Sequence, residues 1–484
     1  MTEHLHQPFD AYMALVAQRA PEQRPRRGGS PVAVIPNRAA GIAATVNALQ
    51  ASTQFKELVR ATRDEFRDDF HSAKSDDRWS RAVSTFFKVG GCYGEPVWPA
   101  APSDLFDAYC NAFRQRVRTI RYLALLEFTE FARPRLDCGT FEIRRFSKAE
   151  LDVFLRSDVS RSFYGYAVAD TAQLCAYWFL VVQREEAVRP VSTIMTVDLS
   201  AMGSAFPSYR LPPAPIEEAL RVLALFDWEL ATPSARGEQP DGWMQLQIPL
   251  FLESSDHLLD PPRAAPDTSV LATETRADVD GEEFEVRVID VEVSEGACGQ
   301  LEGFCCRVNS ALRKFPSGHH WHFFEVAMTY FIRAFLTRGI DQLLWHMTAL
   351  EALLGGGPPE PIQRVGKRLG VILGDTRAVE EKIRRRFKEL YALRCDLVHG
   401  NRVLDSIAAT ELADTRQLAR KAMLWFAHGL HLLQSEAAMT NCTEMPSRTE
   451  LLAVLDFDEK QRRQVGALIA QLPPMFPRIR EWLV

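Results

Sequence analysis

The hydrophobic periodicity of this chain changes twice along its length, and this change limits the folds that it can adopt. Residues 40–130 are dominated by apolar residues at helical spacing, as in the segment 103–131. Several short segments between 139 and 293 alternate apolar and polar residues, and the helical spacing then returns. Alternation is typical of half-buried strands, and a 3.6-residue spacing is typical of amphipathic helices. We therefore predict an α+β fold, with an N-terminal mixed helix/strand region followed by a C-terminal all-α bundle.

The length of 484 residues is more than one hydrophobic core usually supports, so we expect several domains. The predicted parts are a flexible N-terminal arm (1–30), an α+β sensing or regulatory region (31–300) with a break near 132 if it is divided in two, a helical domain (301–435), and a linker with helices (436–484). The predicted strands are 139–146, 174–183, 191–199, 243–253 and 283–293. The predicted helices of the helical domain are 320–337, 341–354, 361–373, 378–399 and 405–435.

Composition narrows the setting of the protein. The nine cysteines include no CxxC pair, so neither a zinc ribbon nor a thioredoxin-type site is indicated. The N-terminus contains acidic residues, histidines and a proline where a signal peptide needs an apolar segment. The longest apolar-rich run, 174–182, is too short to span a bilayer. We expect a soluble, cytoplasmic protein with reduced thiols and no membrane partner.

An arginine interrupts the apolar stripe of the predicted helix 378–399. On a helical wheel of 100° per residue, Arg394 falls in the middle of a stripe formed by Ile383, Phe387, Leu390, Tyr391, Leu397 and Val398. A guanidinium in this place is costly unless it has a partner or faces a cavity. The alternative is that its aliphatic stem packs on the stripe while its charged head reaches solvent.

His399 follows Arg394 by five residues and lies in the last turn of the same predicted helix. Gly400, directly after it, suits the position that ends a helix. The helix dipole and Asp396, three residues earlier, both favour the protonated imidazole. A histidine at a helix end is usually structural or solvated, but its pairing with an anomalous arginine indicates a functional site.

Arg394 and His399 form an R-x4-H motif within LYALRCDLVHG (390–400), and LLWHMTALEALLGG (343–356) precedes it. A Gly/Pro loop and a basic helix separate these two segments. In this combination the chain resembles the ApeA-like branch of the HEPN superfamily over residues 315–435. The resemblance implies a helical bundle, and many HEPN domains are metal-independent RNA endonucleases. Cys395 stands where active members often have Asn, Asp or His, and Asp396 is a candidate substitute.

The resemblance implies that Arg394 and His399 are catalytic residues of an endoribonuclease. His399 would act as general base or acid near neutral pH, and Arg394 would stabilise charge on the phosphate. One histidine cannot both accept and donate a proton in the same step, and HEPN domains commonly pair so that two motifs face one cleft. We therefore expect a homodimer and a 2′,3′-cyclic phosphate product. By resemblance, the expected setting is prokaryotic antiviral defence or toxin-like growth arrest.

Four further residues are predicted to support this site. Glu351 lies at the edge of the apolar stripe of its own helix, where a contact with Arg394 would aim the guanidinium. The alternative, with equal weight, is that Glu351 only marks the boundary between the core and solvent. The other three supporting residues are neighbours of the motif, namely Tyr391, Asp396 and Asn401.

The helix that leads to the motif is basic. Residues 360–402 carry a formal charge of +5, whereas the whole chain carries −6. Such a segment favours an anionic partner, although a basic helix is more often only a solvated face. The predicted partner is RNA, either host tRNA, another single-stranded RNA or viral RNA, and the predicted RNA-binding residues are Lys382, Arg384, Arg385, Arg386, Lys388 and Arg402.

No cofactor and no metal are expected. His319 and His322 have a metal-ligand spacing, but no carboxylate or cysteine cluster accompanies them. Two alternatives to the nuclease stay open: a catalytically silent HEPN module that binds RNA or a partner protein, and a small-ligand sensor whose middle region does the work. Only His399 favours the nuclease, because a silent module has no use for an exposed histidine at this position.

Overall fold

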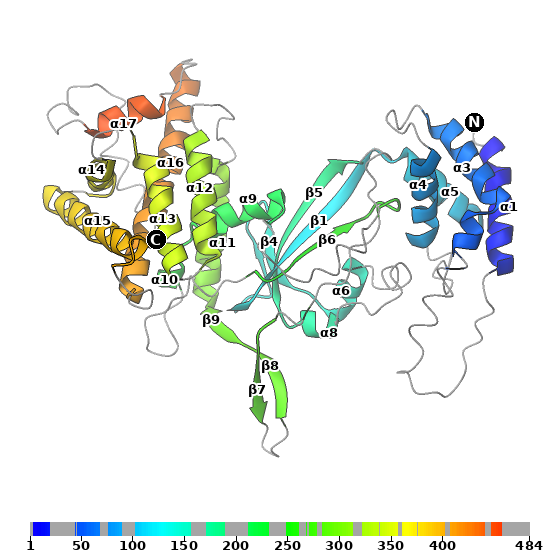
Figure 1. Ribbon diagram of the computed structural model, residues 1–484, viewed down its shortest axis with the longest axis horizontal. Helices are drawn as coiled ribbons and strands as arrows, with labels where there is room; N and C mark the ends of the chain where they lie inside the picture. The colour runs from blue at the N-terminus through cyan, green and yellow to red at the C-terminus, as the bar shows by residue number, and fades with distance from the viewer. Residues whose placement is uncertain are drawn as a thin grey trace.

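The computed structural model of the chain describes residues 3–19, 44, 46–67, 76–89, 102–155, 171–188, 212–231, 248–260, 268, 271–277, 283–312, 322–337, 339–356, 361–374, 376–401, 407–440 and 447–456. These residues form an N-terminal helical group, a central sheet and a C-terminal helical bundle along the long axis of the molecule (Figure 1). The predicted α+β class is confirmed. No helix in the described ranges is long and apolar enough to cross a membrane.

The N-terminal group packs around an aromatic core and consists of α1 (Glu3–Arg19), α3 (Thr53–Phe66), α4 (Asp76–Val89) and α5 (Pro102–Arg114). One face of α1 is apolar and buried, with Leu5, Phe9, Tyr12 and Val16. The prediction of a flexible arm over 1–30 is therefore wrong for residues 3–19, because burial of this face holds the segment in the group. Residues 20–30 lie outside the described residues.

The central sheet is antiparallel, with the strand order β3-β4-β5-β1-β6. The strands are β1 (Val117–Leu126), β3 (Arg135–Asp137), β4 (Glu142–Arg145), β5 (Trp178–Ala187) and β6 (Phe251–Ser255). Side chains of β1 alternate between two cores, so that Leu123 and Leu125 face one and Ala124 and Leu126 the other. The short helices α6 (Lys148–Phe154) and α8 (Thr171–Leu174) contribute to the first of these cores.

The prediction of one helical segment over 103–131 is wrong after Arg114. Residues 122–126 are buried on both faces of the sheet because each face is covered by a core. Periodicity alone cannot assign such a run to helix or strand, and here its pairing with β5 and β6 decides the conformation. The break expected near 132 accordingly falls between α5 and β1.

The other expected strands lie close to observed ones. β4, β5 and β6 overlap three of them, and the segment expected over 283–293 divides into β8 (Glu283–Arg287) and β9 (Ile289–Val293). β9 pairs in parallel with β2 (Phe128–Phe131), and β8 pairs with β7 (Thr273–Ala277) in a hairpin that extends away from the sheet (Figure 1). The strand expected over 191–199 lies outside the described residues.

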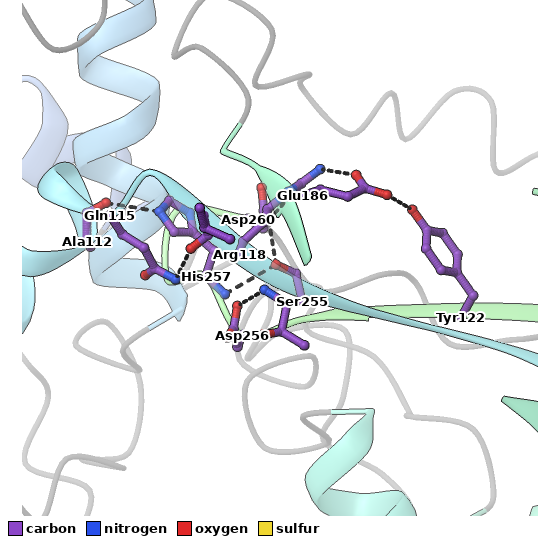
Figure 2. A network of polar contacts seen from close by, with 11 residues as sticks. Ala112, Gln115, Arg118, Tyr122, Glu186, Ser255, Asp256, His257 and Asp260 are labelled. Carbon is purple, nitrogen blue, oxygen red and sulfur yellow. Dashed lines mark hydrogen bonds and ion pairs between the residues drawn. The ribbon is translucent and has the colours of Figure 1, made fainter. Parts of the chain in front are cut away.

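A polar network joins the N-terminal helices to the sheet (Figure 2). Arg118, buried at the start of β1, forms an ion pair with Asp260 and a longer one, at 3.6 Å, with Glu186. His257 is also buried, and its Nε2 donates to the carbonyl oxygen of Ala112 in α5 across 3.0 Å. Burial lowers the pKa of His257, which keeps the ring neutral near pH 7. The end of α5 is thereby fixed to the loop that follows β6.

The C-terminal bundle consists of α11 (Glu295–Leu312), α12 (His322–Phe335), α13 (Gly339–Leu354), α14 (Pro361–Leu373), α15 (Arg377–Val398), α16 (Ala409–Thr440) and α17 (Arg448–Asp456). The helices α12 to α16 correspond to the five predicted ones. Leu451, Leu452 and Leu455 of α17 belong to the same core, so this core extends past the expected domain end at 435. The core also includes one face of the sheet.

Buried ion pairs hold the sheet region against the bundle. Asp227 follows α9 (Ala214–Leu223), and Glu229 lies in α10 (Trp228–Ala231). Arg420 Nη2 lies 2.5 Å from Asp227 Oδ2, and Arg416 Nε lies 3.2 Å from Glu229 Oε1. Gln417 Nε2 donates to both carboxylates, at 3.0 and 2.5 Å. Both arginines are buried, and we call these five residues the clasp.

Removal of one carboxylate from the clasp should destabilise the protein. Asp227→Ala leaves the buried guanidinium of Arg420 without its closest anion, so we expect the free energy of unfolding to fall by about 3 kcal/mol. The control is Glu218→Ala, which breaks a solvent-exposed pair with Arg184 and should cost less than about 1 kcal/mol. Urea denaturation of the full-length protein, followed by circular dichroism, measures both. Equal effects of the two variants would contradict a stabilising role for the clasp.

Candidate functional site

The last turn of α15 fixes His399 at the surface. The backbone N–H of Asn401 donates to the carbonyl oxygen of Asp396 at 2.8 Å, and that of Gly400 to Leu397 at 3.2 Å. Gly400 has φ +71°, a left-handed conformation that an L-residue adopts only at a cost. These features define a Schellman motif, so the predicted helix end at Gly400 is confirmed. His399 is the capping residue, and its side chain is exposed.

The side chains of Asp396 and Asn401 are also exposed. Neither forms a hydrogen bond or an ion pair with Arg394 or His399 within the described part of the chain. What the structure shows of these two residues is the contribution of their backbone groups to the turn. Their predicted supporting role therefore has a geometric basis in the position of His399, and none in a side-chain contact.

Arg394 lies at the margin of the buried face of α15, and the prediction that it lies in the middle is wrong. The buried residues of this helix are Phe387, Leu390, Leu393 and Leu397. The centre of these four positions, which include Leu393, lies about 45° from Arg394 on the helical wheel. Val398, on the other side of Arg394, is 50% exposed. Arg394 itself is half-buried.

The guanidinium of Arg394 is held by an aromatic ring. Its Cζ lies 5.4 Å from the centroid of the Tyr391 ring, which is within the range of a cation–π contact. The Nε atom is buried and has no hydrogen-bond partner among the described residues. No ion pair fixes the charged group in this part of the chain. Tyr391 is thus the only described side chain with a directional interaction on Arg394.

Glu351 acts on Tyr391 and does not pair with Arg394 in the described structure, so the predicted direct contact is wrong. Burial and then the charge of the Glu351 carboxylate raise the pKa of Tyr391, and a side-chain hydrogen bond between the two residues adds to this. Glu351 lies in the last turn of α13, which packs beside α15. The two helices therefore bring Glu351 and Arg394 to opposite parts of the same tyrosine.

Two arginines from elsewhere in the bundle fix the end of α13 next to Glu351. Arg448 Nη2 donates to the carbonyl oxygens of Ala352 at 2.8 Å and Gly355 at 2.5 Å, and Arg368 donates to that of Leu354. These carbonyl groups lack partners within the helix. Sequence reasoning missed both arginines, and only the Gly-Gly pair at 355–356 signals that the helix ends there with free carbonyls.

Arg394 and His399 point in directions about 140° apart on α15. No hydrogen bond joins their side chains, and Cys395 is half-buried between them on the helix. The two predicted catalytic residues therefore share a helix but do not form one site within a single chain through direct contact. Arg394 is half-buried, and His399 is exposed.

The structure divides the predicted RNA-binding residues into paired and unpaired ones. Arg386 is half-buried and binds Asp414 at 2.7 Å and Glu389 at 3.1 Å. Arg384 faces Glu381 at 3.6 Å in an exposed pair. The exposed residues without an ion pair among the described residues are Lys382, Arg385 and Lys388. Arg402 lies outside the described residues.

Two of the three unpaired cations share a face with His399. Arg385, Lys388 and His399 lie within about 60° of one another on the helical wheel, whereas Lys382 lies about 100° from His399. This face is opposite to the buried one, so it is in contact with solvent. Arg385 and Lys388 thus place two unpaired cations on the solvent-facing side of α15 that carries His399, and the exposed Glu381 shares this side.

No group of three or more His, Cys, Asp or Glu side chains within the described ranges is arranged to hold a metal ion. His319 lies outside these ranges. His322 is exposed and lies 3.3 Å from Glu325 in an i, i+3 pair. Of the two histidines, the structure describes only His322, and its described polar partner is Glu325 of the same helix.

No protein-family model, no curated protein and no solved structure matches this chain. The interpretation of the site accordingly depends on its own residues. They offer a half-buried guanidinium at the edge of the core, an exposed imidazole at a helix end, and two unpaired cations on the solvent-facing side of the same helix.

The expected RNA binding should depend on salt through the unpaired cations of α15 and not through the paired Arg386. Arg385→Ala and Lys388→Ala should each reduce the slope of log affinity against log salt by about 0.7, the value for one phosphate contact on a single strand. Arg386→Ala is the matched control on the same helix and should leave the slope unchanged, because Asp414 and Glu389 already neutralise this charge. Fluorescence anisotropy with a labelled RNA that carries 2′-O-methyl groups measures the slopes. A reduced slope for Arg386→Ala alone would contradict this division.

We predict that Tyr391 contributes to RNA affinity through the contact of its ring with Arg394. Tyr391→Leu removes the cation–π contact, so we expect affinity for the same RNA to fall by roughly three- to tenfold. Tyr391→Phe keeps the ring and loses only the hydrogen bond that the hydroxyl donates to Glu351, so its effect should be smaller. In an Arg394→Ala background, Tyr391→Leu should have no further effect, as a double-mutant cycle would show. Independent effects of the two substitutions would mean that Tyr391 does not act through Arg394.

Proposed function

We propose that this protein is a metal-independent RNA endonuclease of the HEPN type, related in its motif to the ApeA-like branch. One observation carries the proposal: α15 holds a half-buried arginine without an ion pair in the described structure and ends at an exposed histidine. The sequence resemblance supplies the reaction and its setting, which is prokaryotic antiviral defence or toxin-like growth arrest in the cytoplasm. The substrate is RNA.

The chemistry follows from the two side chains. The imidazole of one His399 takes the proton from a ribose 2′-OH, and the 2′-oxygen attacks the adjacent phosphorus. Arg394 donates to the phosphate oxygens as negative charge accumulates on them. The bond from phosphorus to the 5′-oxygen breaks, and that oxygen takes a proton from a second imidazole. The products are a 2′,3′-cyclic phosphate and a 5′-OH end.

A homodimer provides the second imidazole. Each chain has one R-x4-H motif, and the divergence of Arg394 and His399 by about 140° separates them within one chain. Two copies of α15 that face each other across a two-fold axis would place both motifs in one cleft. In this arrangement His399 of one protomer is the base and the partner's His399 is the acid.

The same divergence favours one alternative. A HEPN module that binds RNA or a partner protein without cleaving it needs the positive face of α15 but no contact between Arg394 and His399. Cys395 at the position after the arginine agrees with this alternative. A small-ligand sensor in the middle region has no comparable observation in its favour.

Cleavage assays decide between nuclease and silent module. The purified protein should cleave RNA in the presence of EDTA, and Arg394→Ala and His399→Ala should each lower the rate by at least about 100-fold, because each removes charge stabilisation or proton transfer. Glu381→Ala removes an exposed charge from the same helix and is the control, which should have a much smaller effect. Intact RNA with wild-type protein, together with RNA binding that depends on Arg385 and Lys388, would support the silent module.

Mixed dimers test the shared cleft. Wild-type chains are co-expressed in equal amounts with chains that carry both Arg394→Ala and His399→Ala. If one cleft needs both motifs, only dimers of two wild-type chains are active, and the activity per chain falls to about a quarter. If each chain cleaves by itself, the activity falls to about a half, and the composite site is wrong.

A further inference from the structure

A second arginine–aromatic group lies on the surface of the same bundle. The rings of Tyr330 in α12 and Trp345 in α13 are nearly parallel, with an interplanar angle of 10° and centroids 5.6 Å apart. The Cζ of Arg333 lies 5.3 Å from the Trp345 ring and 5.8 Å from the Tyr330 ring. All three side chains are partly exposed. We call these three residues the aromatic platform.

The platform carries an uncompensated charge. Arg333 forms no ion pair among the described residues. The nearest acidic residue on α13 is Asp341, one turn before Trp345, and on α12 Glu325 is engaged by His322. Partly exposed rings with an unpaired guanidinium suit a ligand that is both flat and anionic. Unpaired nucleotides have this combination, since their bases stack on aromatic rings and guanidinium planes.

The platform and the Arg394 site flank one strip of α13. Leu344, Thr348 and Ala352 recur at intervals of four residues and are partly exposed. On the helical wheel Trp345 and Glu351 lie about 60° to either side of Thr348. Trp345 contacts Tyr330 and Arg333 of α12. Glu351 contacts Tyr391 of α15.

The separation suits a short single strand. Glu351 follows Trp345 by six residues, which corresponds to about 9 Å along the helix axis. A nucleotide chain that crosses this strip can therefore place a phosphate near Arg394 and a neighbouring base on the platform. A base within a duplex is stacked on its neighbours and is not free to do this.

We propose that Tyr330, Arg333 and Trp345 bind an unpaired base of the RNA substrate. This inference rests on the proposed function, and it limits the substrate class to single-stranded RNA or to loops. The base stacks on the exposed aromatic surface, and Arg333 interacts with the adjacent phosphate. Because stacking does not depend strongly on base identity, the platform selects unpaired RNA without specifying its sequence.

Binding measurements with uncleavable RNA test the platform. The probes are a labelled single-stranded oligonucleotide with 2′-O-methyl groups and the same strand annealed to its complement. Trp345→Leu should weaken binding of the single strand by roughly 5- to 100-fold, the loss expected for one stacked base, and leave duplex binding unchanged. Trp345→Phe keeps a ring and should recover most of the affinity. Arg333→Gln should weaken single-strand binding by roughly two- to fivefold.

Several outcomes would overturn the platform. One is unchanged single-strand affinity of Trp345→Leu, and another is an equal loss for single strand and duplex. A third is a shift from dimer to monomer in analytical ultracentrifugation, which would assign the three residues to a contact between protein chains. Trp345→Phe guards against misfolding, because a loss caused by unfolding alone is not restored selectively for single strands.

The same variants separate this inference from the nuclease proposal. If the wild-type protein fails to cleave RNA in EDTA but Trp345→Leu still loses single-strand binding, the platform stands and the nuclease proposal fails. If the protein cleaves RNA and Trp345→Leu binds and cleaves like the wild type, the nuclease proposal stands and the platform fails.

Discussion

The clasp is a buried set of charges that joins the sheet region to α16 of the helical bundle, close to the point where α16 contacts α15. Asp227 and Glu229 are held by three side chains from the third and fourth turns of α16. Asp414, only two residues before Arg416, binds Arg386 of α15 from the same helix. α16 therefore contacts the middle region and the motif helix within a few residues. The contact with the middle region is buried, whereas the Arg386–Asp414 pair that reaches α15 is partly exposed.

The placement of Arg394 is a compromise between burial and exposure. A guanidinium in a core would require a carboxylate, and full exposure would leave it without a fixed direction. Tyr391 provides a third solution, because its ring carries no formal charge that would compete with a phosphate for the arginine. The buried Nε without a partner among the described residues is the cost of this arrangement. Glu351 stabilises the tyrosine and thus influences the arginine without neutralising it.

Much of the bundle could be predicted from the sequence, because its helices have clear periods and ends. Gly400 is one example, because a glycine directly after His399 was sufficient to predict the observed end of α15. The strand β1 could not be predicted, since a segment buried on both faces has no dominant period. The buried face of α15 was misplaced because Leu393 was not counted in its stripe.

The candidate site shows the same limit more sharply. The sequence pointed to Arg394, His399 and Glu351, but not to the way in which they are related. The contact of Glu351 with Tyr391 depends on how α13 packs on α15, and the shorter of the two ion pairs of Arg386 depends on Asp414 of α16. Neither has a local sequence signal. Helix packing therefore decides which of the predicted charges remain available to a ligand.

The cap at the end of α13 has a consequence for the order in which the site is assembled. Arg448 reaches the carbonyl oxygen of Ala352 from 96 residues further along the chain. A side chain at position 355 would clash with the Glu351 carbonyl oxygen, so the chain turns tightly there. Arg448 donates to the carbonyl oxygens of Ala352 and Gly355 at this turn. During synthesis, α15 with Arg394 and His399 leaves the ribosome before Arg448 does. Arg368, which caps Leu354, leaves before the motif helix, whereas the carbonyl oxygens of Ala352 and Gly355 gain their partner only after it. The end of α13 beside Glu351 is thus capped in two steps, one on each side of the synthesis of α15.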